Sequence, residues 1–203
     1  ALGLDDPPPE LVDDEPGFTL DLSALVVPEG PGALAGLDAA DAALIEVRAR
    51  GDRLAAAINN LLATGARAIV STVPDMGLSP YALAQEKIKA GAAARMSALT
   101  FEFNSRLRTG IDPTRFDGRN YGLILADDVI QAMARYPTSY VLTNVVDGVC
   151  AVALPNCTSA TADLIASDAT SANYLWADDR HLGPTAHSYI GSQAVSRAAN
   201  NPF

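Results

Sequence analysis

Both histidines of the 203-residue chain, His181 and His187, lie in one short segment near its C-terminal end. Any chemistry that needs an imidazole is therefore confined to that segment. Asp178 precedes His181 by three residues, a spacing at which a carboxylate in a tight turn accepts a hydrogen bond from one ring N–H. The other ring nitrogen then stays free to act as a base. This is the arrangement of the acid and the base in a Ser-His-Asp site.

A complete site of that kind also needs an activated hydroxyl nucleophile and hydrogen-bond donors for the oxyanion. The chain contains neither a Gly-x-Ser-x-Gly nor a Gly-Asp-Ser motif. The nearest match, Gly51-Asp52-Arg53, has no serine and falls within an expected helix. The sequence therefore predicts an acid and a base without an evident nucleophile.

Two other interpretations of the same segment remain open. Asp178 and Asp179 are residue types that cap a turn ahead of a helix, which would give them a purely structural role. Asp178, Asp179, His181 and His187 are also residue types that bind a metal ion, but no second cluster and no pair of histidines at helical spacing supports such a site.

Composition limits the classes of partner. The chain has 24 acidic and 14 basic residues, a formal net charge of −10, which argues against nucleic acid or an anionic membrane surface as a partner. With 49% hydrophobic residues, residues 1–203 are expected to form a single domain. No apolar run approaches the roughly 20 residues that span a bilayer, so we expect no transmembrane segment. Residues 1–32, rich in Pro, Asp and Glu, are expected to form an acidic arm or insertion.

The two cysteines suggest the compartment. Six residues lie between Cys150 and Cys157, in a stretch with Pro155 and Asn156 that a local disulfide can close. We interpret them as a disulfide, which favours an oxidising environment and hence a secreted, periplasmic or cell-surface protein. Two unpaired thiols are the alternative.

The elements that must position the Asp178–His181 segment follow from apolar periodicity. A long helix is expected from about Ala35 until Gly65, with Gly51 on its apolar face, where we expect the close approach of another backbone. A strand is expected over 68–73, then a loop bracketed by Pro74 and Pro80. The residues expected on the apolar face of the long helix are Leu44, Val47, Leu54, Ile58 and Leu61.

The second half of the chain gives further elements. A helix ending at Gly110 is expected to bury Met96, Leu99, Phe103 and Leu107. A buried strand over 121–125 precedes a helix over 127–135, and a last helix begins at Pro184. Strands that are apolar on both faces belong in the middle of a parallel sheet covered by helices, yet only two are found. Either strands escaped detection, or the rest of the sheet lies in another piece of polypeptide.

Several motifs, in order, resemble those of the GDSL, or SGNH, esterases and lipases of secreted bacterial type. Asp178-x-x-His181 before Pro184-Thr185-Ala186-His187 and a terminal helix is similar to the last conserved block of that family. The run 65–67, an apolar strand and the loop 74–80 resemble the central part of its secreted members. Phe103-Asn104 and Thr143-Asn144 are similar to later landmarks, and the resemblance covers roughly residues 54–197.

The resemblance implies an α/β fold, a three-layer αβα sandwich with a parallel, flavodoxin-like sheet. It also implies a carboxylic ester hydrolase, an esterase or lipase working through an acyl-serine intermediate with no cofactor. Asp178 would orient the imidazole and His181 would act as the base. The nucleophile Ser, Gly and Asn blocks, which precede these motifs in the family, have no counterpart here, which also accounts for the missing strands. We therefore expect this chain to be the C-terminal portion, with a companion N-terminal fragment of the same protein.

Two alternatives to this assignment stay open. In the family His-Pro-Thr is uninterrupted, whereas Leu182 and Gly183 separate His181 from Pro184, so His187 is the alternative base. The alternative function is a noncatalytic secreted binding or scaffold domain that keeps the fold and lacks the nucleophile.

Overall fold

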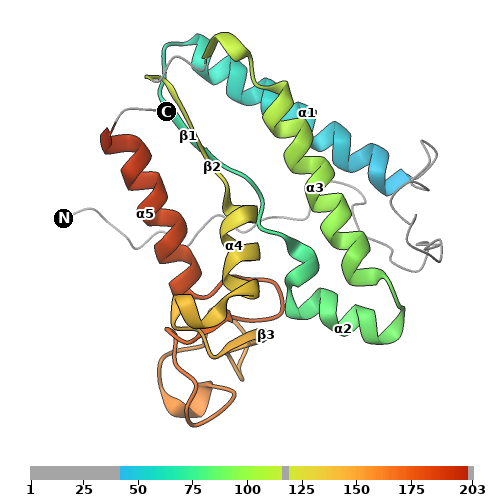
Figure 1. The fold of residues 1–203 in the computed structure, drawn as a ribbon, viewed down its shortest axis with the longest axis vertical. Coiled ribbons are helices and arrows are strands. Elements are labelled where there is room, and N and C mark those ends of the chain that lie inside the picture. The colour runs from blue at the N-terminus through green and yellow to red at the C-terminus, as the bar shows by residue number, and fades with distance from the viewer. Residues whose placement is uncertain (1–41, 116–118, 201–203) are drawn as a thin grey trace.

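The structure is a computed structural model that describes residues 42–115 and 119–200. Within these ranges it is an α/β protein with five α-helices and four short strands, arranged as two separate two-stranded parallel sheets (Figure 1). None of the described helices combines the length and the apolarity needed to cross a membrane. The expected acidic arm, residues 1–32, lies outside the described residues.

Helices α1 (Ala42–Ala63) and α3 (Ala92–Gly110) lie alongside each other as the largest helical contact of the fold (Figure 1). The expected close approach at Gly51 is confirmed. A Cβ added there would lie 2.7 Å from the Cβ of Arg106 and 2.8 Å from the carbonyl oxygen of Phe103. Gly51 thus lets the backbones of the two helices come together. The α1 helix ends two residues before Gly65, which has the expected positive φ of 84°.

The buried face of α1 differs in part from the expected one. Leu44, Val47 and Ile58 are buried as expected, but Leu54 and Leu61 are 38% and 48% exposed. Ala55 and Leu62, the next residues along the chain, are buried in their place. The buried residues of α1 are Leu44, Val47, Gly51, Ala55, Ile58 and Leu62.

The strands β1 (Ala68–Ser71) and β2 (Tyr121–Ile124) pair in parallel, with Ala68 opposite Tyr121. Both strands were expected, and both end slightly earlier than expected. In Figure 1 the pair runs between α5 (Pro184–Asn200) on one side and the α1–α3 pair on the other. Tyr121 packs with residues of α1 and α3 in one apolar cluster. Helices therefore lie on both sides of these two strands.

A helix that was not expected, α2 (Pro80–Ile88), begins where the expected loop ends, in a stretch to which no element was assigned. Ser79 caps it by accepting a hydrogen bond from the N–H of Ala82 (3.2 Å), and Pro80 takes the first helical position, where its missing N–H costs nothing. Helix α4 (Ala126–Arg135) follows β2 within one residue of the expected boundary.

Two strands also escaped the sequence analysis. β3 (Asn144–Gly148) and β4 (Tyr174–Trp176) pair in parallel to form the second sheet. All three residues of β4 are buried, and Leu175 and Trp176 join α4 and α5 in a shared apolar cluster. Between the two strands lies a long loop, drawn in orange at one end of the molecule in Figure 1, which contains the predicted disulfide between Cys150 and Cys157. β4 leads directly into the segment with Asp178 and His181.

Candidate functional site

The segment after β4 folds back on itself in a tight turn. The N–H of Ala177 donates to the carbonyl of His181 (2.7 Å), and the N–H of Gly183 donates to the carbonyl of Leu175 (2.7 Å). These two bonds close a short antiparallel bridge on either side of residues 178–180. The turn therefore starts from a buried strand, which fixes the position of its backbone.

Within the turn, Asp178 organises both the backbone and the imidazole. Its Oδ1 accepts hydrogen bonds from the N–H of Arg180 (2.9 Å) and from the N–H of His181 (2.7 Å). The ring Nδ1 of His181 lies 2.8 Å from Oδ2 of the same carboxylate. The structure thus brings together the two residues that the sequence analysis singled out, in the geometry expected from their spacing.

The carboxylate of Asp178 is held in its ionised form. Burial raises its pKa, but the amide N–H groups of Arg180 and His181 and the His181 imidazole together lower it by more, so the pKa lies below its ordinary value. An ionised carboxylate only accepts hydrogen bonds, so Nδ1 of His181 carries the proton. Nε2 is then the basic nitrogen. The His181 side chain is 67% exposed, whereas that of Asp178 is 24% exposed, which leaves Nε2 accessible.

Two neighbouring elements hold the turn from outside. Gly148, the last residue of β3, is so close to Asp178 that an added Cβ would lie 2.6 Å from its Cα. On the other side, the N–H of Tyr81 in α2 donates to the carbonyl of Asp179 (2.9 Å), and the guanidinium of Arg180 lies over the Tyr81 ring at 4.4 Å. The unpredicted elements β3 and α2 therefore position the predicted pair.

An open groove of about 560 Å³ runs beside the Asp178–His181 pair. Its lining comes from the disulfide loop, Ile165, the end of β3, the start of α2 and the turn that holds the pair. His181 lines the groove, so a molecule lying in it is next to the imidazole.

His187 does not share this environment. It lies exposed in the first turn of α5, and within residues 42–115 and 119–200 its ring makes no hydrogen bond. The described part of the chain also has no group of three or more His, Cys, Asp or Glu side chains arranged to hold a metal ion. Of the two histidines, only His181 is oriented by a carboxylate.

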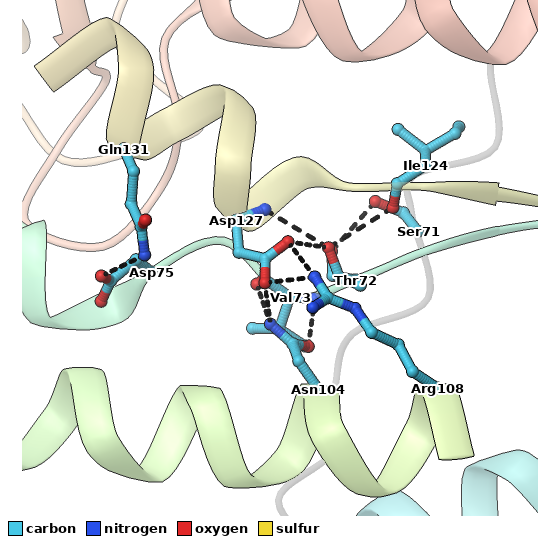
Figure 2. Close-up of polar contacts among 9 residues, drawn as sticks. All are labelled: Ser71, Thr72, Val73, Asp75, Asn104, Arg108, Ile124, Asp127 and Gln131. Carbon is cyan, nitrogen blue, oxygen red and sulfur yellow. Dashed lines mark hydrogen bonds and ion pairs between the residues drawn. The ribbon is translucent and has the colours of Figure 1, made fainter. Parts of the chain in front are cut away.

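A second polar cluster, which the sequence analysis did not predict as a unit, lies at the carboxyl ends of β1 and β2 (Figure 2). The carboxylate of Asp127, in the first turn of α4, accepts hydrogen bonds from Thr72 (2.6 Å) and Asn104 (3.2 Å). It also forms an ion pair with Arg108 (2.6 Å). Asn104 also binds the backbone of Val73 through both its amide atoms, at 2.8 and 2.9 Å.

The contacts of this cluster indicate a structural role. Asp127 is only 7% exposed and its acceptor sites are occupied by partners from β1 and α3. The cluster therefore ties the end of β1 to α3 and α4. The sequence does not distinguish a buried acidic residue at the start of a helix, such as Asp127, from an exposed one, such as the neighbouring Asp128. The only feature of the sequence that indicates the cluster is the presence of Asn104 and Arg108 on one face of a helix.

Asp75 belongs to a similar structural set. Its Oδ1 accepts from the hydroxyl of Ser97 (2.7 Å) and the N–H of Gly77 (3.0 Å), and its Oδ2 accepts from Gln131 (3.1 Å) (Figure 2). These contacts cap the short helix η2 (Met76–Leu78) and join it to α3 and α4.

Comparison with known proteins gives no relative: no protein-family model matches the chain, and no significant match is found among curated proteins.

Proposed function

We propose that this chain provides the acid and the base of a carboxylic ester hydrolase, an esterase or lipase of the SGNH type. The observation that carries the proposal is the contact between Nδ1 of His181 and the ionised carboxylate of Asp178, with the imidazole otherwise exposed beside a groove. Within the described residues, the only hydrogen-bond partner of the ring is Asp178. Because the sequence has neither a Gly-x-Ser-x-Gly nor a Gly-Asp-Ser motif, the proposal assigns the nucleophilic serine to a companion N-terminal fragment of the same protein.

The proposed reaction uses Nε2 of His181 as base and then as acid in each of two half-reactions. It first takes the proton of the serine hydroxyl as the serine oxygen attacks the ester carbonyl carbon. It then donates that proton to the alcohol oxygen as the bond between the carbonyl carbon and this oxygen breaks, which leaves an acyl-serine. In the second half-reaction the same nitrogen takes a proton from water as the water oxygen attacks the acyl carbon, and it returns that proton to the serine oxygen as the bond between the acyl carbon and this oxygen breaks, which releases the carboxylic acid. Asp178 holds the ring tautomer and stabilises the imidazolium that forms in each step.

The first sheet supports the idea of a companion fragment. A parallel sheet of only two strands is marginal on its own, because parallel strands are normally covered on both faces and flanked by neighbours. In the described residues β1 pairs only with β2, and Ile69 of β1 is 37% exposed. Strands supplied by the companion fragment would complete a three-layer αβα sandwich. The disulfide favours a secreted, periplasmic or cell-surface location for the assembled enzyme.

Substitution of each histidine by alanine in the complete enzyme tests the proposal. His181→Ala is expected to lower kcat for a chromogenic short-chain ester by about 10³- to 10⁴-fold, since it removes the base. His187→Ala is the matched control, because His187 is exposed and not paired with a carboxylate, and it is expected to change kcat less than about threefold. Equal activity of the two variants would rule out the role given to His181.

A further inference from the structure

The groove beside the Asp178–His181 pair is lined by both apolar and acidic side chains. Three apolar side chains, those of Val152, Leu154 and Ile165, line it although they are 37%, 38% and 51% exposed. Exposed apolar side chains that gather in one concave surface mark a binding site more often than scattered ones do. We propose that these three side chains bind the acyl chain of the ester, next to the base.

The charge of the groove indicates which ligands it excludes. Asp147, Asp178 and Asp179 line it, and no Lys or Arg does so in the described part of the chain. Although the carboxylate of Asp179 lies 3.6 Å from the guanidinium of Arg180, three carboxylates among the lining residues disfavour an anionic ligand, such as a phosphate headgroup or a free fatty acid. The substrate class is therefore a neutral ester. The same charges favour departure of the carboxylate product once hydrolysis is complete.

The disulfide loop holds the apolar side chains in place before a ligand binds. The bond between Cys150 and Cys157 closes the segment that carries Val152 and Leu154. Ile165 is fixed to the same region because its N–H donates to the carbonyl of Val149 (2.9 Å). A surface that is ordered in advance loses less conformational freedom when an acyl chain binds to it. The disulfide thus has a function in substrate binding as well as in stability.

The acyl half of the substrate suits the groove better than the alcohol half. The acyl chain is bonded directly to the carbonyl carbon that must lie beside His181, and it has no polar atoms to desolvate against three aliphatic side chains. The alcohol half of many natural esters has further hydroxyl groups, which these side chains cannot satisfy. The groove therefore selects for the length of the acyl chain.

This inference rests on the proposed esterase activity and is tested on the complete enzyme with p-nitrophenyl acetate, butyrate and octanoate. A fully buried CH₂ group raises kcat/KM about fourfold, and an open groove covers only part of each group. We expect kcat/KM for octanoate to exceed that for butyrate by about tenfold. The double variant Leu154→Ser/Ile165→Ser is expected to lose most of this gain, so that its kcat/KM values for octanoate and butyrate become similar. Val195→Ser, an exposed apolar residue of α5, is the matched control and should keep the gain.

Three results would overturn the inference while leaving the esterase proposal intact. The first is a rate of hydrolysis that does not depend on acyl length, and the second is a gain with octanoate that is unchanged in the double variant. The third is a gain that appears with octyl acetate but not with octanoate and that the double variant removes. If no ester is hydrolysed, the esterase proposal fails by itself. The groove is then judged by the methyl NMR signals of Val152, Leu154 and Ile165. Shifts with methyl octanoate but not with methyl acetate support the site, and unchanged signals refute it.

Discussion

Gly148 is in such close contact with Asp178 that there is no room for a side chain, so a substitution at this position should disturb the Asp178–His181 pair. In a Gly148→Ala variant the new Cβ would lie 2.6 Å from Cα, 2.7 Å from the carbonyl carbon and 2.8 Å from the oxygen of Asp178. These are backbone atoms, so no side chain can rotate away to relieve the contact. Either β3 or the turn with Asp178 and His181 has to move.

The size of that movement follows from the contact distances. An ordinary contact of 3.4 Å requires a displacement of about 0.8 Å from the present 2.6 Å. A misplacement of about 1 Å in a catalytic arrangement costs about 10²-fold in rate. We therefore expect Gly148→Ala to lower kcat by about 10- to 100-fold in the complete enzyme, with the protein still folded.

Steady-state hydrolysis of a short-chain ester by the complete enzyme measures the loss in kcat. In a sample that contains only residues 1–203, the Nδ1–H signal of His181 in the ¹H NMR spectrum reports the hydrogen bond to Asp178. Gly191→Ala in α5 is the matched control, because nothing lies within 4 Å of its added Cβ. It is expected to keep full activity and to gain about 0.5–1 kcal/mol of stability. Wild-type activity and an unshifted Nδ1–H signal in Gly148→Ala would refute the reasoning.

Three further predictions concern stability, measured by chemical denaturation. Replacing both Cys150 and Cys157 by Ala is expected to lower the free energy of unfolding by about 2–3 kcal/mol, since the short loop gains freedom mainly in the unfolded chain; no change would mean that the disulfide does not form. Asp127→Ala is expected to lower the free energy of unfolding by about 3 kcal/mol, because it removes the carboxylate that Arg108 and Asn104 contact. The control Asp52→Ala, at an exposed ion pair with Arg106, should have little effect. Similar losses in the two variants would contradict the structural role of Asp127. The lowered pKa of Asp178 implies that wild type is more stable than Asp178→Asn above about pH 4. This difference in stability should disappear as the pH falls through the lowered pKa. A difference that persists in acid would show that the carboxylate charge is not involved.

The elements found from the sequence are those with a local signal. The apolar spacing in α3 predicted three of its buried residues, Met96, Leu99 and Leu107, because the side of a helix that faces the core repeats every three or four residues, whereas Phe103 is only partly buried. The contact between Asp178 and His181 was predicted for the same reason, since a three-residue spacing within one turn fixes their separation. Both inferences needed no knowledge of distant parts of the chain.

The features that were missed depend on distant contacts. β4 is only three residues long, and it is recognisable as a strand only through its pairing with β3 about 30 residues earlier. The contact of Gly148 with Asp178 and the lining of the groove by Ile165 likewise join segments that are far apart in the sequence. Helix α2 did have a local signal, the Ser79-Pro80 start, but Pro80 was interpreted as the end of a loop and not as the first residue of a helix.

The central claim is that His181 activates a serine supplied by a companion N-terminal fragment. Labelling of the complete protein with a serine-reactive fluorophosphonate, followed by mass spectrometry of the labelled peptide, tests it most directly. We expect one labelled serine outside residues 1–203, with a labelling rate that falls by orders of magnitude in His181→Ala and stays the same in His187→Ala. The absence of labelling, or labelling that does not depend on His181, would contradict it and would favour a noncatalytic binding domain.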